Sequence, residues 1–388
     1  MPYRLEERKF LKQRLLAGDS ILMLAMRRTG KTWLCHRLED DAAEGGYTAA
    51  FCNLEGCNDE TAAFSELCGA VEPQRPFKKL AKDRVQEVLG NVAKGKADAS
   101  SWKDLLLRTD WRESLRRLLS VLNKDSKPWV VVLDELPLFV MKLIRLDRAR
   151  AANFLSQLRA FRHEFPNVRW LVTGSVGLDV ISRREKLGGT INDLERFDLQ
   201  PLTRDAARRL IANLNSDGEC PAPFHLGEAA FDHFVMRLTW LSPYYIKRLA
   251  VEIRPTGESL AYGPARHATT ANVDRAFEAL LSNGNRGYFA AWPEHIEINF
   301  EPVERQRILA ILSFLSARQE GATIDTLLSV VGRQQPGVVR AQMLETLDML
   351  GSDGYLECVE GRYRFLSGLI RSWWARWMPG DGLPDGEA

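Results

Sequence analysis

The amino-acid sequence predicts an α/β protein, in which a parallel sheet flanked by helices is followed by a helical region and a small C-terminal module. In the first half, apolar runs typical of buried strands alternate with helical stretches, which is the pattern of parallel strands joined by helices. From about residue 203 to 285 the pattern is helical with little strand character. From about residue 303, three helical stretches precede a hairpin around Glu360 and Gly361, as in a winged helix-turn-helix module.

The length and composition are those of a chain with several folded domains. At 388 residues the chain exceeds the size at which single cores usually stop growing, so two or three domains are expected. Its 45% hydrophobic and 27% charged residues exclude wholesale disorder. The net charge of +2 provides no general basic field, so nucleic acid or an anionic membrane must be met by a local patch.

Five apolar stretches predict the strands of the sheet. They are SILMLA at 20–25, YTAAFCNLEG at 47–56, PWVVVLDELP at 128–137, VRWLVTGS at 168–175 and LERFDLQ at 194–200. We predict a sheet domain over 1–202 with a helical insertion at about 56–127, a helical lid over 203–300, a winged-helix domain over 301–378 and a disordered tail over 379–388. The basic middle of the insertion is interpreted as a solvated face, with phosphate contact as the alternative.

Targeting and metal motifs are missing from the sequence. The N-terminus is charged throughout, and Asp134 and Glu135 interrupt the most apolar run, so we expect no membrane segment. The six cysteines never have CxxC spacing, which argues against a zinc site or a disulfide framework. A cytoplasmic protein with reduced thiols is the expectation.

The stretch LMLAMRRTGKTWL, residues 22–34, has the strand, loop and helix order of a phosphate-binding loop. Amides at the start of a helix converge on phosphate, and the helix dipole favours its charge. Lys31 is expected to reach the outer phosphates of ATP or ADP, Thr32 to bind Mg²⁺ through its hydroxyl, and Gly30 to allow close approach. The other residues assigned to nucleotide binding are Arg27, Arg28, Thr29 and Trp33.

The loop departs from the usual pattern because Ala25 occupies the position of its first glycine. A methyl group is tolerable there if the backbone keeps a negative φ. The Gly-Lys-Thr triplet alone decides little, since such triplets also arise by chance. The prediction of a nucleotide site therefore depends also on the polar groups that follow the third and fourth strands.

Asp134 and Glu135 directly follow four apolar residues, so they emerge at the carboxyl end of a buried strand, the edge where open α/β sheets bind nucleotides. We expect Asp134 to hold Mg²⁺ and Glu135 to orient and deprotonate the attacking water. The alternative is that the acidic pair only caps the next helix. After the fourth strand, Thr173 or Ser175 could polarise that water, and a simple strand-to-turn transition is the competing interpretation.

With these motifs in order, residues 4 to 378 resemble the archaeal-type ATPases of the STAND and AAA+ superfamily of P-loop NTPases. In that family, loops similar to GPRRVGKT carry the paired arginines seen here as Arg27 and Arg28. The resemblance implies an ATPase that binds ATP and Mg²⁺, acts as a molecular switch and ends in a winged helix. The family's usual Gly-Arg start is missing from the opening segment, which leaves the adenine contacts open.

The helical lid contains TWLSPYYIKRLA, which resembles the family's TGGxPYYL element beside the base and ribose. Pro243 suits a first helical turn, where its missing N–H costs nothing. Tyr244 and Tyr245 are either pocket residues or ordinary core. Arg183 and Arg184 are the leading candidates for the arginine that stabilises charge on the γ-phosphate, with Arg196 next. An arginine supplied in trans would require a homo-oligomer.

DNA is a candidate partner for the winged helix, through Arg333, Arg340, Gln342, Arg362 and Arg364. Residues 303–378 contain nine arginines, no lysine and eight acids, a balance of +1 that is far from a basic footprint. Clamping the ATPase or binding a protein effector is the alternative, and the aromatic cluster of Trp373, Trp374 and Trp377 favours packing or an interface.

The sequence therefore predicts an ATP-hydrolysing, Mg²⁺-dependent molecular switch that engages a partner or DNA. The alternatives are an ATP/ADP sensor that does not hydrolyse nucleotide, and a winged-helix DNA-binding regulator that nucleotide tunes.

Overall fold

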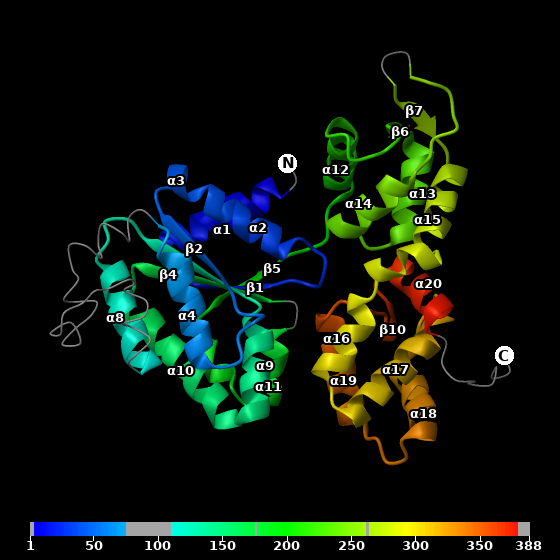
Figure 1. Ribbon diagram of the computed structural model, residues 1–388. Coiled ribbons are helices and arrows are strands. Elements are labelled where there is room, and N and C mark those ends of the chain that lie inside the picture. The colour runs from blue at the N-terminus through cyan, green and yellow to red at the C-terminus, as the bar shows by residue number, and fades with distance from the viewer. Residues whose placement is uncertain (1–3, 75–109, 175–176, 261–263, 379–388) are drawn as a thin grey trace. The chain divides into compact units, whose positions relative to one another are not determined.

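The computed structural model of the chain describes residues 4–74, 110–174, 177–260 and 264–378. The chain divides into two compact units (Figure 1). We call residues 4–26 and 30–199 the sheet unit, and residues 27–29 with 200–388 the C-terminal unit. The middle of the predicted insertion, Ser175 and the predicted tail lie outside the described residues.

The sheet unit is built on five parallel strands in the order β2-β3-β4-β1-β5. The strands are β1 Ile21–Leu24, β2 Thr48–Asn53, β3 Trp129–Asp134, β4 Val168–Gly174 and β5 Glu195–Asp198. Because β4 lies between β1 and β3, the segments that follow β1 and β3 meet at one edge of the sheet, above the end of β4.

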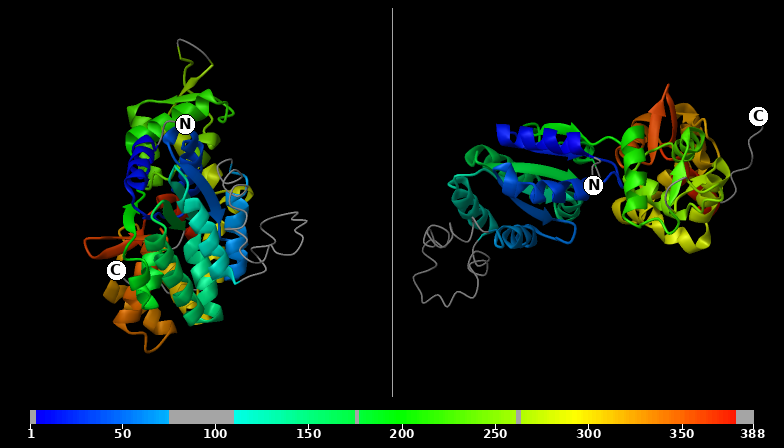
Figure 2. Two further views of the ribbon diagram at one scale, coloured as in Figure 1. Left: turned by 90° about the vertical axis from the view of Figure 1, so that its left-hand side faces the viewer. Right: turned by 90° about the horizontal axis from the view of Figure 1, so that it is seen from above.

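Helices cover both faces of this sheet, as the view from above in Figure 2 shows. They are α1 Leu5–Ala17, α2 Lys31–Asp40, α3 Ala42–Gly45, α4 Glu60–Val71, α8 Trp111–Asn123, α9 Leu136–Leu146, α10 Arg148–Glu164 and α11 Leu178–Arg184, with a 3-10 turn η2 at Gly188–Thr190. In β3, Val131 and Leu133 face the core formed with α4, α8, α9 and α10, whereas Val130 and Val132 face the core formed with α1 and α2. Burial on both faces explains the continuous apolar run of this strand.

The C-terminal unit begins with the predicted helices. They are α12 Arg204–Ser216, α13 Glu228–Leu238, α14 Pro243–Glu252, α15 Thr270–Leu280, a 3-10 helix η3 Asn283–Tyr288 and α16 Ala291–Asn299. Thr203 caps α12 by accepting a hydrogen bond from the Ala206 amide. The unit also contains a small parallel pair, β6 Phe224–Leu226 and β7 Arg266–Ala268, which was not among the predicted strands.

The rest of this unit has the element order of a winged helix: helix, strand, two helices and two strands. These are α17 Pro302–Ser316, β8 Ala322–Thr323, α18 Ile324–Gln334, α19 Arg340–Ser352, β9 Leu356–Val359 and β10 Arg362–Phe365, followed by α20 Gly368–Trp377. The β9-β10 hairpin turns at Glu360 and Gly361, whose φ values of 51° and 76° suit a tight two-residue turn.

A buried aromatic cluster joins the first helices of the C-terminal unit to its last ones. Trp292 donates through Nε1 to the Tyr245 hydroxyl, and the Tyr355 hydroxyl donates to the Trp292 carbonyl at 2.7 Å. Phe289 stacks on both Tyr245 and Trp373. Tyr245 is therefore core, and Trp373 and Trp374, at most 1% exposed, serve packing within the unit.

Among the described residues, no helix combines the length and apolar character needed to cross a bilayer.

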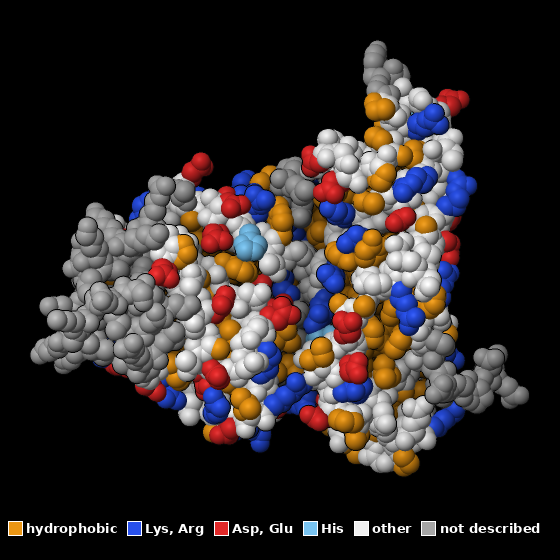
Figure 3. Space-filling model, viewed as in Figure 1, with side chains coloured by type: hydrophobic (Ala, Val, Ile, Leu, Met, Phe, Trp, Pro, Cys, Tyr) orange, Lys and Arg blue, Asp and Glu red, His pale blue; other side chains and the backbone are white. Residues whose placement is uncertain are grey.

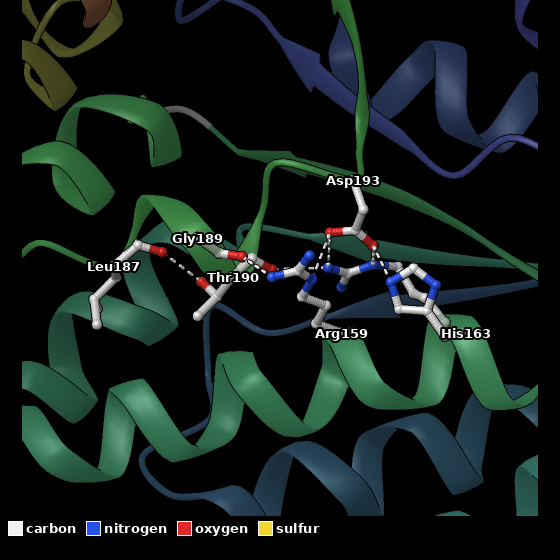
Figure 4. Close-up of polar contacts among 7 residues, drawn as sticks. Arg159, His163, Leu187, Gly189, Thr190 and Asp193 are labelled. Atoms are coloured by element: carbon white, nitrogen blue, oxygen red, sulfur yellow. Dashed lines mark hydrogen bonds and ion pairs between the residues drawn. The ribbon is translucent and has the colours of Figure 1, made fainter.

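A polar clamp holds the segment between α11 and β5 against α10. Arg162 makes a bidentate ion pair with Asp193, with both N–O distances 2.7 Å. Arg159 and His163 flank the same carboxylate, each at 3.8 Å (Figure 4). Arg162 also donates to the Thr190 carbonyl at 2.8 Å. One carboxylate thus organises three side chains of α10 and fixes the segment leading into the edge strand.

Replacing Asp193 by asparagine should lower the free energy of unfolding of the sheet unit by about 2 to 3 kcal/mol at pH 7, because hydrogen bonds to charged groups have this magnitude. Burial alone would raise the pKa of the Asp193 carboxyl, but the hydrogen bonds and charge of Arg162 outweigh burial and lower it. The stabilisation should therefore be complete above about pH 4, the ordinary aspartate range, and disappear as the pH falls through the folded-state pKa.

Urea unfolding of wild type and variant across this pH range measures the effect. The control is Asp40→Asn, whose exposed ion pair with Arg37 should contribute under about 1 kcal/mol. An equal loss in both variants, or a loss from Asp193→Asn that does not depend on pH, would contradict the clamp.

Candidate functional site

The loop between β1 and α2 has the backbone of a phosphate-binding turn. Gly30 precedes α2 with φ 90° and ψ 27°, a left-handed conformation that favours glycine. Ala25 is not among the residues with positive φ, so its methyl group causes no backbone strain. No side chain caps α2, and the start of a helix is an end that favours an anion.

The side chains of this helix start meet the acidic pair at the end of β3. The Thr32 hydroxyl donates to Asp134 Oδ2 at 2.9 Å. Lys31 Nζ lies 3.6 Å from Glu135 Oε1. Lys31 and Asp134 are only 6% and 1% exposed, so the two charges are held in the protein interior. The strand order explains this meeting, since β1 and β3 both neighbour β4.

The electrostatics of Asp134 favour a bound cation. Burial raises the pKa of the Asp134 carboxyl, and the Glu135 charge raises it further, while Lys31 and the Thr32 hydrogen bond oppose the increase. A hydroxyl and a carboxylate are oxygen donors of the kind that Mg²⁺ uses. Among the described residues, no group of three or more His, Cys, Asp or Glu side chains forms a metal cage. Thr32 and Asp134 therefore fit a cation that takes its other ligands from water and phosphate, as Mg²⁺ does.

Glu135 does not cap the helix that it precedes. It has φ 56° and ψ 29° at the N-cap of α9, and its side chain makes no capping hydrogen bond. Its backbone N–H donates to Asp134 Oδ1 at 3.1 Å, while its carboxylate lies beside Lys31. A left-handed glutamate costs conformational energy, and such residues cluster at functional sites. The capping alternative for the acidic pair is therefore disfavoured.

Gly174, at the end of β4, is a site residue that the sequence analysis did not single out. A Cβ atom there would lie 2.4 Å from Cδ of Pro137 and 3.4 Å from Oε2 of Glu135. The glycine lets the start of α9, and with it Glu135, approach β4 closely. The neighbouring Thr173 is fully buried and its hydroxyl has no hydrogen-bond partner among the described residues. The predicted role of Ser175 falls outside the described residues.

The predicted arginines lie at the surface of the sheet unit. Arg183 and Arg184 are exposed in the last turn of α11. Arg196 pairs with Asp179 at 3.0 Å. Their catalytic role stays a prediction. Trp33 is half-buried, with the Arg37 guanidinium 5.3 Å from its ring centre.

Arg27, Arg28 and Thr29 group with the C-terminal unit. The Ser242 hydroxyl donates to the Arg28 carbonyl at 2.6 Å, and the Arg28 guanidinium lies 4.3 Å from the centre of the Tyr244 ring. Pro243 is buried in the first turn of α14, where the sequence analysis placed it. Nucleotide contacts by these residues remain predictions.

The arginines considered for DNA contact are mostly engaged within their own module. Arg340 pairs with Asp325, Arg362 donates to the carbonyls of Glu320 and Gly321, and Arg364 pairs with Glu357 at 2.8 Å. On the face of the C-terminal unit shown in Figure 3, basic and acidic side chains are interspersed. These partners, and the face that Figure 3 shows, give no specific support to a DNA footprint.

Comparisons with known proteins identify the fold. No family model and no curated protein matches the sequence. The structure is similar to the Walker-type ATPase PABY2304 of Pyrococcus abyssi, with a TM-score of 0.64, 13% identity and 95% of each chain covered. It is also similar to the Aeropyrum pernix ORC2 protein in its ADPNP-ADP complexes, with a TM-score of 0.55, 15% identity, and 97% of this chain and 93% of that chain covered. The chain thus has an α/β P-loop fold, with a five-stranded parallel sheet flanked by helices and a helical C-terminal region.

Substituting alanine for Gly174 should destabilise the sheet unit by about 1 to 3 kcal/mol, the usual cost of overpacking, because the new methyl group would displace the Pro137 ring. Urea unfolding provides the measurement. Gly188→Ala is the matched control, since its Cβ would meet nothing within 4 Å and its effect should stay within about 0.5 kcal/mol. Equal stability of the two variants would show that α9 does not depend on this close approach.

Proposed function

We propose that this chain is a Mg²⁺-dependent ATPase that alternates between ATP- and ADP-bound states as a molecular switch. The observation that carries the proposal is the convergence of the loop and the acidic pair: Thr32 hydrogen-bonds Asp134, and Lys31 lies beside Glu135. The fold supports it, because one protein of this fold is known in complexes with ADPNP and ADP. The finer assignment to the STAND branch of the AAA+ ATPases, with a C-terminal winged helix, is part of the same proposal.

In this proposal Lys31 exchanges its partner when nucleotide binds. Its ammonium group lies beside the Glu135 carboxylate, and the outer phosphates of ATP would compete for it. The first amides of α2 bind the same phosphates. Transfer of Lys31 to the phosphates leaves the Glu135 carboxylate able to accept a proton from the attacking water. ATP binding itself would thus prepare the base.

Thr32 and Asp134 would hold Mg²⁺ through the hydroxyl and the carboxylate. When bound, the ion neutralises charge on the phosphates. Arg183 or Arg184, exposed on α11, would stabilise charge on the γ-phosphate of a neighbouring copy, which makes a homo-oligomer part of the proposal. As the output of the switch we propose contact with a protein effector rather than DNA, because three of the arginines of the C-terminal module already have partners.

Glu135→Gln should slow phosphate release from Mg²⁺·ATP by about 100-fold or more while nucleotide stays bound, because the amide cannot accept the proton. Lys31→Ala should instead weaken binding of a fluorescent ATP analogue by about tenfold or more. Glu113→Gln, an exposed glutamate paired with Arg117, is the control and should leave both quantities unchanged.

These assays also separate the hydrolase from its rival, a nucleotide sensor without turnover. A wild-type protein that binds the analogue through Lys31 but releases no phosphate would be such a sensor. Loss of neither binding nor turnover in Lys31→Ala would remove the proposed site altogether.

Asp134→Asn separates ion binding from folding. The raised pKa of Asp134 means that its charged form is disfavoured in the folded protein, so its destabilising effect should grow as the pH rises through the ordinary aspartate range. We therefore expect the nucleotide-free variant at pH 7 to be at least as stable as wild type in urea. The enhancement of nucleotide affinity by Mg²⁺ should fall about tenfold or more. A variant that unfolds more readily, yet keeps its Mg²⁺ dependence, would contradict this role.

A further inference from the structure

A cavity of about 370 Å³ lies within the C-terminal unit. Its walls come from the end of α13, from α15, from the β9-β10 hairpin and from α20. The volume falls in the range of small-molecule sites. Three of its lining residues are arginines, Arg237, Arg364 and Arg371, against one carboxylate, Glu357.

Arg371 has no carboxylate partner among its described hydrogen bonds and ion pairs. Its Nη1 donates to the Ser316 carbonyl at 3.3 Å, which leaves its positive charge without a counter-ion. Burial lowers the pKa of the Arg371 guanidinium, and the charge of Arg237, which lines the same cavity, lowers it further. An arginine stays protonated in proteins, and the repulsion therefore persists until an anion arrives.

The carboxylates near Arg237 also contact other basic side chains. Arg237 lies 3.4 Å from Asp274 and 3.5 Å from Glu278, but Asp274 also contacts His233 and Glu278 also pairs with Arg376. Glu357 pairs with Arg364 at 2.8 Å. Arg237 and Arg364 thus have carboxylate partners, and Arg371 is the wall arginine for which the described hydrogen bonds and ion pairs include none.

The cavity wall is held in place at a conformational cost. Thr239 has φ 56° and ψ −42°, a conformation that a β-branched residue rarely adopts. Its hydroxyl accepts a hydrogen bond from the Gly368 amide at 2.7 Å and donates to the Leu366 carbonyl at 2.9 Å, tying the end of α13 to the start of α20. Gly368 is close-packed here, since a Cβ would lie 3.0 Å from the Arg237 carbonyl. Strain of this kind is kept where the surrounding structure fixes it.

We propose that this cavity binds the phosphate group of a small phosphorylated molecule, with Arg371 and Arg237 as its main ligands. Guanidinium groups donate bidentate, charge-assisted hydrogen bonds to phosphate oxygens, and a dianion between two arginines converts their repulsion into attraction. A phosphate group alone leaves part of 370 Å³ unfilled, so there is room for an organic portion of the ligand. The Arg237 guanidinium lies 3.8 Å from the centre of the Phe277 ring, which is part of the same wall. The site is independent of the proposed ATPase activity.

The test uses the full chain carrying Lys31→Ala, so that binding at the loop of the sheet unit is weakened. Inorganic phosphate and ribose 5-phosphate are titrated calorimetrically at constant ionic strength, with chloride and ribose as controls. We expect both phosphates to bind, and Arg371→Gln to weaken them by about tenfold or more, the loss of a charged hydrogen bond. Arg333→Gln, which removes an equal charge from the exposed end of α18, should leave binding unchanged. Tighter binding of ribose 5-phosphate than of phosphate would identify the organic portion as part of the ligand.

A second measurement distinguishes a ligand site from a structural arginine. Without phosphate, Arg371→Gln should melt at the same temperature as its parent or higher, because a partly buried charge without a described carboxylate partner is removed. With phosphate, only the parent should gain further stability. Binding that survives Arg371→Gln, an equal loss in Arg333→Gln, or stabilisation by chloride equal to that by phosphate would overturn the proposal.

Discussion

The hydrogen bond from Thr32 to Asp134 is the interaction on which the candidate site depends. It joins the start of α2 to the end of β3, two segments 102 positions apart in the chain. The two partners can meet because β1 and β3 are parallel, end at the same edge of the sheet and are separated only by β4. The same strand order places Lys31 beside Glu135, so it accounts for both the Thr32–Asp134 and the Lys31–Glu135 contacts.

The same arrangement explains why charged residues are tolerated in the interior. Lys31 and Asp134 are almost fully buried, and an isolated charge there would be strongly destabilising. Each of them is compensated by a neighbour, but the raised pKa of Asp134 shows that the compensation is incomplete. A site in which the charge of a carboxylate is only partly compensated is suited to reversible binding of a cation. The polar clamp around Asp193 is the contrasting case, because the arginines around this carboxylate lower its pKa and its role is to hold structure.

The C-terminal unit distributes its charges differently. Its aromatic residues form a hydrogen-bonded core that includes Tyr245, Trp292 and Tyr355. This core holds together helices that are far apart in the sequence. Arginines on its hairpin and on α19 are used to bind neighbouring segments. The cavity lined by Arg237 and Arg371 differs, because the described hydrogen bonds and ion pairs give Arg371 no carboxylate partner. An anion-binding site is therefore expected where an arginine lacks a carboxylate partner, and the net charge of the unit does not indicate this place.

The sequence by itself determined the local features of this protein: the five strands, the loop at Gly30, Pro243 in its helical turn and the hairpin at Glu360 and Gly361. Each of these follows from residues close together in the chain, where periodicity and backbone preference act. Only the tertiary structure decided the strand order, the close approach at Gly174, the bond from Thr32 to Asp134 and the arginine cavity. These depend on distances between residues far apart in the chain, and a pattern within a single segment carries no information about what will pack against it.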